Sequence, residues 1–315
     1  MSNPQIQIKS LCMHPSSAAE RNRFSRRVRS GTLVRPVRSL YAPTDEWEKL
    51  DAVERARHIA VALAELHPAW VFSLFTAAAL YGLEIGRNYA MPLHVQVPRG
   101  SCTRDTAEIT HHPLTCKNSA TVGAVRVTPP VPTVVDCLFE LPFSRALAVA
   151  DSALRVLGLS KEELLREVQS RSEGRGQAIA TSAIKFADAR AANGGESVAR
   201  AVMIEQGFMI PELQVKIGDP LDPSGSYYVD FRWRLSSGDV IGELDGKDKY
   251  VLPEMTGGRE TIDVVIDERH RESRLTVPGS KVMRFSFRDV LDEGRFVSLL
   301  ELYGIPRGPA RKVSE

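Results

Sequence analysis

The chain has 315 residues, of which 43% are hydrophobic and 25% are charged, and its formal net charge is +2. These proportions are typical of a soluble globular protein and exclude a wholly disordered chain, a collagen-like repeat and a coiled-coil rod. The length predicts two or three domains, because a domain usually takes about 100–200 residues.

The longest apolar stretch, residues 69–83, has 15 residues, fewer than the roughly 18 that a membrane-spanning helix needs. The first residues do not resemble a secretory signal segment, and four scattered cysteines do not predict a disulfide framework. We therefore expect a cytoplasmic protein with no membrane partner.

Positive charge is concentrated at the N-terminus. Residues 1–41 hold eight basic residues against a single acid, Glu20, so this arm has a formal charge of +7. The remainder holds 33 basic and 38 acidic residues and has a formal charge of −5. This asymmetry favours nucleic acid or another polyanion as the partner of the arm.

Residues 16–30 predict a helix that starts at candidate N-cap serines and ends at Gly31. Residues 31–43 predict two short strands that turn near Pro36. A helix followed by a basic hairpin is the minimal pattern of a winged helix-turn-helix, with the hairpin as the wing. The basic side chains expected to contact phosphate are Arg23, Arg26, Arg27, Arg29, Arg35 and Arg38. The alternative is a solvated basic helix beside a structural hairpin.

The middle of the chain predicts helices with a few short strands. Residues 44–66 form one expected helix, and residues 71–83 form a buried helix that ends at Gly82. Short strands are expected at residues 93–97, 110–112 and 124–128, and a helical block at residues 133–192. Gly194 and Gly195 then mark a boundary, because they interrupt an alanine-rich helical stretch.

Beyond this boundary the pattern becomes mixed. Helices are expected at residues 196–206, 261–275 and 288–303, and strands at residues 213–217, 227–235, 240–245 and 281–287. The whole chain is therefore predicted to be α+β, with three regions. They are a winged helix-turn-helix (1–45), a helical and mixed middle region (46–193) and a small α/β domain (194–315).

The expected strands at 227–235 and 240–245 carry a group of acids. If residues 236–239 form a four-residue turn, Leu235 pairs with Val240 and Asp230 lies opposite Asp245. Because side chains alternate between the faces of a strand, Asp230, Glu243 and Asp245 then project from one face. Three carboxylates this close repel one another unless a cation lies among them, and Mg²⁺ or Mn²⁺ suits oxygen ligands.

Lys247 or Lys249, just after the second strand, would orient a water molecule or neutralise developing charge. The opposite face carries Val229, Phe231, Trp233 and Leu244, which are expected to pack against helices. In the alternative interpretation the acids form the solvent face of the hairpin and pair with Arg232 and Arg234.

Residues 194–303 contain four spaced blocks of a known pattern. The blocks are Glu196-Ser197 with Arg200, Val229-Asp230-Phe231 with Glu243-Leu244-Asp245-Gly246 and Lys249-Tyr250, Glu268-Arg269-His270-Arg271-Glu272 with Leu275, and Val282-Met283-Arg284-Phe285. This segment resembles the PD-(D/E)XK, restriction-endonuclease-like superfamily, in particular a branch with a very-short-patch-repair-like nuclease domain. The resemblance implies a nuclease fold that holds Mg²⁺ or Mn²⁺ at Asp230, Glu243 and Asp245 and cleaves DNA.

The same resemblance adds Glu196 to the site and leaves three assignments open. Asp245 stands where the superfamily has its lysine, so the catalytic lysine is either Lys247 or Lys249. Arg269 and Arg271 either contact phosphate or form the exposed side of their helix. Glu196 itself is also favoured in a first helical turn by the helix macrodipole, without any ligand.

The first half carries a second set of motifs. They include Gly31-Thr32-Leu33-Val34-Arg35 with Tyr41, Thr76-Ala77-Ala78-Ala79-Leu80-Tyr81-Gly82-Leu83, and Ala150-Asp151-Ser152-Ala153-Leu154-Arg155. These segments resemble the N-terminal and middle regions of the AbiEi family of type IV antitoxin-like proteins. The resemblance implies a winged-helix DNA reader and raises a cognate toxin-like protein as a partner.

The sequence therefore predicts two alternative functions. One is a DNA-binding protein that hydrolyses phosphodiester bonds with Mg²⁺. The other is a non-catalytic transcriptional regulator of a type IV toxin–antitoxin or phage-defence system. A zinc site at Cys102, His111, His112 and Cys116, completed by His94 or Cys137, is disfavoured because the spacing fits no common zinc framework.

Overall fold

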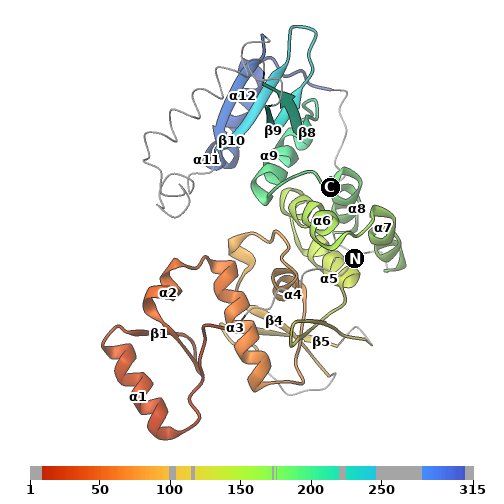
Figure 1. Cartoon of the computed structure of the whole chain (residues 1–315). Coiled ribbons are helices and arrows are strands. Elements are labelled where there is room, and N and C mark those ends of the chain that lie inside the picture. The colour runs from red at the N-terminus through yellow and green to blue at the C-terminus, as the bar shows by residue number, and fades with distance from the viewer. Residues whose placement is uncertain are drawn as a thin grey trace.

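The computed structural model describes residues 9–98, 104–114, 118–171, 174, 176–219, 225–245 and 279–308. Within them the chain is a mixture of helices and strands, as the α+β prediction requires. Figure 1 shows an elongated arrangement in which the N-terminal hairpin, a five-stranded sheet, a layer of helices and a four-stranded sheet follow one another. None of the helices in the described part combines the length and apolar character of a bilayer-spanning helix.

The N-terminal helix α1 (Ala18–Arg29) packs beside a two-stranded hairpin. Ser17 caps the helix by accepting a hydrogen bond from the Glu20 amide at 3.1 Å. The strands β1 (Leu33–Val37) and β2 (Leu40–Pro43) are antiparallel. The expected hairpin is confirmed, and its turn lies at residues 38–39, just beyond Pro36. Pro36 itself lies inside β1, where the pairing with β2 becomes irregular and tolerates its missing N–H.

The expected single helix over residues 44–66 is two helices, α2 (Thr44–Lys49) and α3 (Ala52–Leu66). Asp51 separates them. Its carboxylate accepts hydrogen bonds from the amides of Val53 and Glu54, and the Glu54 side chain accepts one from the Asp51 amide. This capping box starts a new helix at the point where α2 ends.

A five-stranded sheet follows, in the order β5-β4-β3-β7-β6. Its strands are β3 (Val71–Phe72), β4 (Leu93–Val97), β5 (Ile109–Pro113), β6 (Ala120–Val122) and β7 (Val125–Val127). The expected helix over residues 71–83 is wrong at its start, because Val71 and Phe72 pair with β4 and Phe72 also pairs with β7. The helix α4 (Leu74–Leu80) begins only after this pairing, and a short 3-10 helix, η1 (Arg87–Tyr89), precedes β4.

Four helices form the next layer: α5 (Pro130–Glu140), α6 (Phe143–Leu157), α7 (Lys161–Ser170) and α8 (Gln177–Phe186). Prolines mark two of their starts, since Pro129 and Pro142 are the N-cap residues of α5 and α6. One hydrophobic cluster runs through this layer, the five-stranded sheet and the N-terminal hairpin. It includes Leu40 of β2, Phe72 of β3 and Leu147 of α6.

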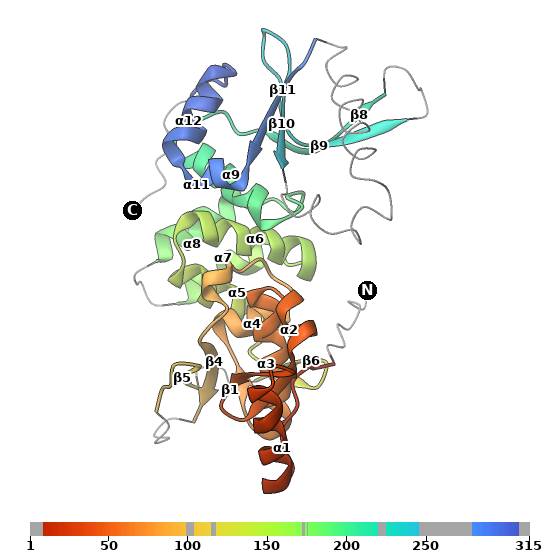
Figure 2. The same cartoon turned by 90° about the vertical axis from the view of Figure 1, so that its left-hand side faces the viewer.

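The C-terminal unit has its own sheet and its own core. The elements are α9 (Gly194–Glu205), β8 (Glu212–Gly218), β9 (Ser226–Trp233), β10 (Val240–Asp245), β11 (Lys281–Ser286), α11 (Phe287–Leu291) and α12 (Glu293–Leu302). The order is β11-β10-β9-β8, in which β8, β9 and β10 are antiparallel neighbours and β11 runs parallel to β10 (Figure 2). Phe231, Trp233 and Phe285 of the sheet pack with Val198 of α9 and Phe296 of α12. The helix expected at residues 261–275 lies outside the described residues.

A buried ion pair joins the helical layer to this unit. Arg200 of α9 donates through Nη2 to both carboxylate oxygens of Asp151 on α6, at 2.7 and 2.6 Å. The two side chains are only 4% and 0% exposed. Arg200 also donates to the Phe186 carbonyl, and the Asp188 amide donates to Asp151, each at 2.7 Å. The pair therefore fixes α9 on α6 and also holds the segment that connects α8 to α9.

We predict that Arg200→Met lowers the free energy of unfolding by about 3–5 kcal/mol, because it leaves a buried carboxylate without its counter-charge. Adding Asp151→Asn removes that charge and restores part of the loss. Urea denaturation measures both effects. Arg234→Met, which breaks the exposed pair of Arg234 with Glu212, is the control and is expected to cost less than about 1 kcal/mol. Equal losses for the two single variants would contradict the prediction.

Candidate active site

Glu196 lies in the first turn of α9 and is 2% exposed. Its carboxylate accepts hydrogen bonds from the Ala192 amide at 2.8 Å and from Asn193 Nδ2 at 2.7 Å. Gly194 and Gly195, expected to interrupt the helix, instead form its first residues. A Cβ atom on Gly195 would lie 2.9 Å from Leu244 Cδ2, so glycine allows the start of α9 to approach β10 closely.

The register of β9 and β10 differs from the prediction by two residues. Val240 pairs with Trp233 rather than Leu235, and Gly242 pairs with Phe231. The connection is longer than a four-residue turn, and it is held by Arg232, whose Nε donates to Asp239 Oδ2 at 2.8 Å. Because the error is an even number of residues, Phe231, Trp233 and Val240 keep their expected face. Continued by one pair, the observed register sets Asp230 beside Glu243 rather than Asp245.

One amide links the carboxylates of the helix and the sheet. Gln214 Nε2, on β8, donates to Glu196 Oε2 at 3.2 Å and to Asp230 Oδ1 at 3.1 Å. The other oxygen of Asp230 accepts a hydrogen bond from the Leu244 amide at 2.9 Å. The sequence did not reveal Gln214, although a polar residue inside the strand pattern Leu-Gln-Val is a signal of this kind.

Glu243 and Asp245 have different surroundings. Glu243 is 7% exposed on β10, whereas Asp245, at the end of the same strand, accepts a hydrogen bond from Arg284 Nη1 of β11 at 3.1 Å. The alternative of a solvent face paired with Arg232 and Arg234 is wrong. These two arginines bind Asp239 and Glu212, and Glu243 is buried.

The apolar face of this hairpin agrees only in part with the prediction. Phe231 and Trp233 pack in the cluster that contains α9, and Leu244 lies against it. Val229 packs with Ile241 in a separate small cluster instead. The side chains of β9 therefore serve two cores.

Burial raises the pKa of Glu196 to about 7, and the negative charge of Asp230 adds to this effect. The hydrogen bonds from the Ala192 amide and Gln214, and the charge of Arg155, act in the opposite direction. Glu196 therefore exchanges a proton near neutral pH, as a general acid or base must.

The donor set suits a hard divalent cation. Within the described ranges, no group of three or more His, Cys, Asp or Glu side chains is arranged to hold a metal ion. Mg²⁺, however, is usually held by one or two carboxylates together with water and substrate phosphate. Asp230 and Glu243, which the β9–β10 register continued by one pair sets side by side, would supply such a pair. Lys247, Lys249, Arg269 and Arg271 lie outside the described residues.

The six N-terminal arginines expected to contact DNA are all exposed, on α1 and on the hairpin. Within the described part of the chain, the ion pairs include none of them. Phe24 of α1 packs edge-on against Tyr41 of β2, with ring centroids 5.1 Å apart, which attaches the basic helix to the hairpin. Residues 9–45 contain one helix before the hairpin, α1, whereas a helix-turn-helix has two.

The histidines considered for zinc fall into two separate contacts. His94 Nδ1 and His112 Nε2 are 2.8 Å apart, and burial together with His112 lowers the pKa of His94 to about 4. His111 pairs with Asp105 instead. Cys137 is buried, and Cys102 and Cys116 lie outside the described residues. His94 and His112 thus form a half-buried hydrogen-bonded pair, and His111 is not part of it.

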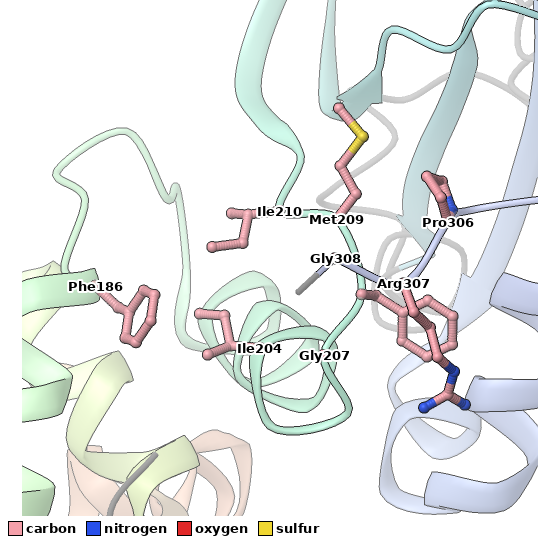
Figure 3. Close-up of a pocket in the computed structure, with 9 residues that line it drawn as sticks. Phe186, Ile204, Gly207, Met209, Ile210, Pro306, Arg307 and Gly308 are labelled. Carbon is pink, nitrogen blue, oxygen red and sulfur yellow. The ribbon is translucent and has the colours of Figure 1, made fainter. Parts of the chain in front are cut away.

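A pocket of about 310 Å³ lies elsewhere, between the end of α9 and residues 306–308. Its lining is mostly apolar, and Figure 3 shows Phe186, Ile204 and Ile210 turned toward the same space. Arg307 covers one side by stacking on Phe208, with its guanidinium carbon 4.5 Å from the ring centroid. None of the expected site residues lines this pocket, so it is not a candidate for phosphodiester chemistry.

No protein-family model matches this chain. Two uncharacterized proteins of Mycobacterium tuberculosis, from strains CDC 1551 / Oshkosh and ATCC 25618 / H37Rv, are each 35% identical to it over 165 residues. The match covers 52% of this chain and 58% of each relative, so it spans less than two thirds of the relatives' own length. These relatives carry no assigned activity that could be compared with the site.

We predict that Glu196→Gln flattens the pH dependence of stability. A pKa of about 7 in the folded protein lies above the usual value of 4.5. The stability that this group contributes is therefore complete below pH 4.5 and is lost as the pH rises through about 7, with an upper limit of about 3 kcal/mol. Glutamine cannot ionise, so the Glu196→Gln variant should not lose this stability as the pH rises.

Urea denaturation at pH 5 and pH 8, without divalent ions, measures the difference. The exposed Glu212→Gln on β8 is the control and should retain the decline seen in the parent protein. A decline of the same size in Glu196→Gln would show that Glu196 does not titrate in this range.

Proposed function

We propose that this chain is a DNA-binding protein whose C-terminal region hydrolyses phosphodiester bonds of DNA with Mg²⁺ or Mn²⁺. One observation carries the proposal. Gln214 brings together the carboxylates of Glu196 on α9 and Asp230 on β9, and Glu243 on β10 comes beside Asp230 when the observed β9–β10 register is continued by one pair.

The chemistry divides among these residues by their surroundings. Asp230 and Glu243 would hold the cation, which when bound polarises a phosphoryl oxygen and lowers the pKa of water. Glu196, with its pKa of about 7, would accept a proton from the attacking water near neutral pH. Asp245 pairs with Arg284, so its charge is balanced beside the site, and we assign it a supporting role.

The N-terminal arm would supply affinity for the DNA backbone. Its arginines are exposed, and Glu20, the single acid of residues 1–41, accepts hydrogen bonds from Ser16. Cations displayed in this way suit phosphate groups, whose neutralisation releases counterions. In this proposal α1 and the β1–β2 hairpin act as the helix and the wing of a winged-helix DNA reader in the cytoplasm.

The second candidate is a non-catalytic regulator, antitoxin-like in the sense of the AbiEi resemblance, with a toxin-like protein as a further partner. Asp245 favours it. The position that carries a lysine in the nuclease superfamily holds an acid here, and this acid is engaged by Arg284. In that case the carboxylates would be a structural remnant, and the arginine-rich arm would carry the function.

We predict that the full chain nicks supercoiled plasmid in Mg²⁺ or Mn²⁺, and that Asp230→Asn with Glu243→Gln reduces the rate by about 10²-fold or more, the scale of a lost catalytic group. Agarose-gel assays measure the rate. Glu212→Gln, also on the sheet but exposed, is the matched control and should leave it unchanged. Equal cleavage by parent and double variant would refute the assignment of these carboxylates. Salt-sensitive binding without any cleavage would favour the regulator.

A second prediction concerns DNA binding by α1. Replacing Arg26, Arg27 and Arg29 with glutamine should weaken binding to duplex DNA. The slope of log K against log salt concentration should fall by about 0.9 for each phosphate group that the variant no longer neutralises. Fluorescence anisotropy across a salt series measures the slope. The exposed Arg166→Gln on α7 is the control, and an unchanged slope in the triple variant would place the DNA-binding surface elsewhere.

A further inference from the structure

Gln214 has an unusual backbone for a residue within a strand. Its φ is +48°, and among the described residues the other non-glycine residue with positive φ is Leu74. Its neighbours Leu213 and Val215 pair regularly with Phe231 and Val229 of β9. A left-handed conformation is unfavourable for a residue with a Cβ atom and persists only where the surroundings enforce it.

The side chain on this backbone lies between two carboxylates from different elements. Gln214 Nε2 is 3.2 Å from Glu196 Oε2 and 3.1 Å from Asp230 Oδ1. An amide nitrogen carries two hydrogens, so it donates one to each acid. Two backbone amides complete the arrangement, since Ala192 donates to Glu196 and Leu244 to Asp230. The amide of Gln214 is the link that joins these two separate contacts into one.

We propose that Gln214 is a positioning residue: it fixes the carboxylates of Glu196 and Asp230 relative to each other, and its left-handed backbone is retained for this purpose. The inference rests on the proposed function only in regarding these acids as the active site. Strand pairing alone does not explain the conformation, because an extended residue would continue the β8–β9 ladder.

The test compares Gln214→Gly with Lys216→Gly in the full chain without divalent ions. Glycine adopts positive φ without strain, so Gln214→Gly should be as stable to urea as the parent protein or more stable. Lys216, exposed on the same strand and not among the positive-φ residues, is the matched control. Glycine there should lower the urea midpoint.

Hydrogen exchange at two amides reports on the carboxylates directly. Exchange at Ala192 and Leu244 should become about three- to tenfold faster in Gln214→Gly, as expected when the variant lacks one hydrogen bond that orders their acceptors. Lys216→Gly should leave both rates unchanged. Asparagine tolerates the left-handed region but is one methylene shorter, so Gln214→Asn should show the same fast exchange as the glycine variant.

Two results would overturn the inference: a urea midpoint for Gln214→Gly as low as that of Lys216→Gly, or unchanged exchange at both amides. Plasmid cleavage separates this outcome from the proposed function. Fast exchange in a protein that does not cut DNA would keep the positioning role and reject the nuclease. Unchanged exchange at both amides, together with cleavage that depends on Asp230, would reject the positioning role and keep the nuclease.

Discussion

The buried ion pair between Asp151 and Arg200 is the interaction on which the geometry of the candidate site depends. Arg200 and Glu196 lie one turn apart on α9, so a shift of α9 against α6 moves both residues together. The pair has almost no access to water, and both partners also bond to backbone groups: Arg200 donates to the Phe186 carbonyl, and the Asp188 amide donates to Asp151. Removal of either partner would leave an uncompensated charge in the interior, so the contact holds α9 against α6.

A second contact from α6 acts on the same segment. Arg155 donates to the Ala191 carbonyl and reaches Glu84, and the next residue, Ala192, donates its amide to Glu196. The helical layer therefore determines where α9 begins as well as how it lies. The segment that holds the carboxylate of Glu196 is therefore fixed in part by the helical layer, and not by the C-terminal sheet alone.

The site combines features that reduce stability. A carboxylate that is 2% exposed has a pKa of about 7, a second acid lies on the other side of one glutamine, and that glutamine has a left-handed backbone. Each of these costs free energy that a purely structural arrangement would avoid. Together they are typical of a functional site, where stability is lost in exchange for a fixed arrangement of charges.

The sequence predicts features that depend on neighbouring residues, but it does not predict contacts between residues that are distant along the chain. Although the predicted β9–β10 register was wrong by two residues, Phe231, Trp233 and Val240 still face the core, because an even shift preserves the face. The break at Asp51 has a local signal, the capping box of Asp51 with Glu54, which lies within a longer helical pattern. The partners of Gln214 and the pairing of Asp151 with Arg200 could not be predicted from the sequence, although the polar residue inside Leu-Gln-Val is itself a signal. Both join residues that are distant in sequence, and periodicity describes only neighbours.

The two charged regions that the sequence separated are also separated in space. The exposed arginines of α1 lie at one end of the molecule, and the four-stranded sheet with its carboxylates lies at the other, with the five-stranded sheet and the helical layer between them (Figure 2). The +7 arm therefore does not neutralise the acids of the candidate site. Hydrogen bonds from Gln214 and from backbone amides favour the charged forms of Glu196 and Asp230, whereas burial opposes the charged form of Glu196. The same separation means that any polyanion held by the arm reaches the carboxylates only by extending along the molecule. The helical layer that fixes α9 would then set the distance between the two contacts.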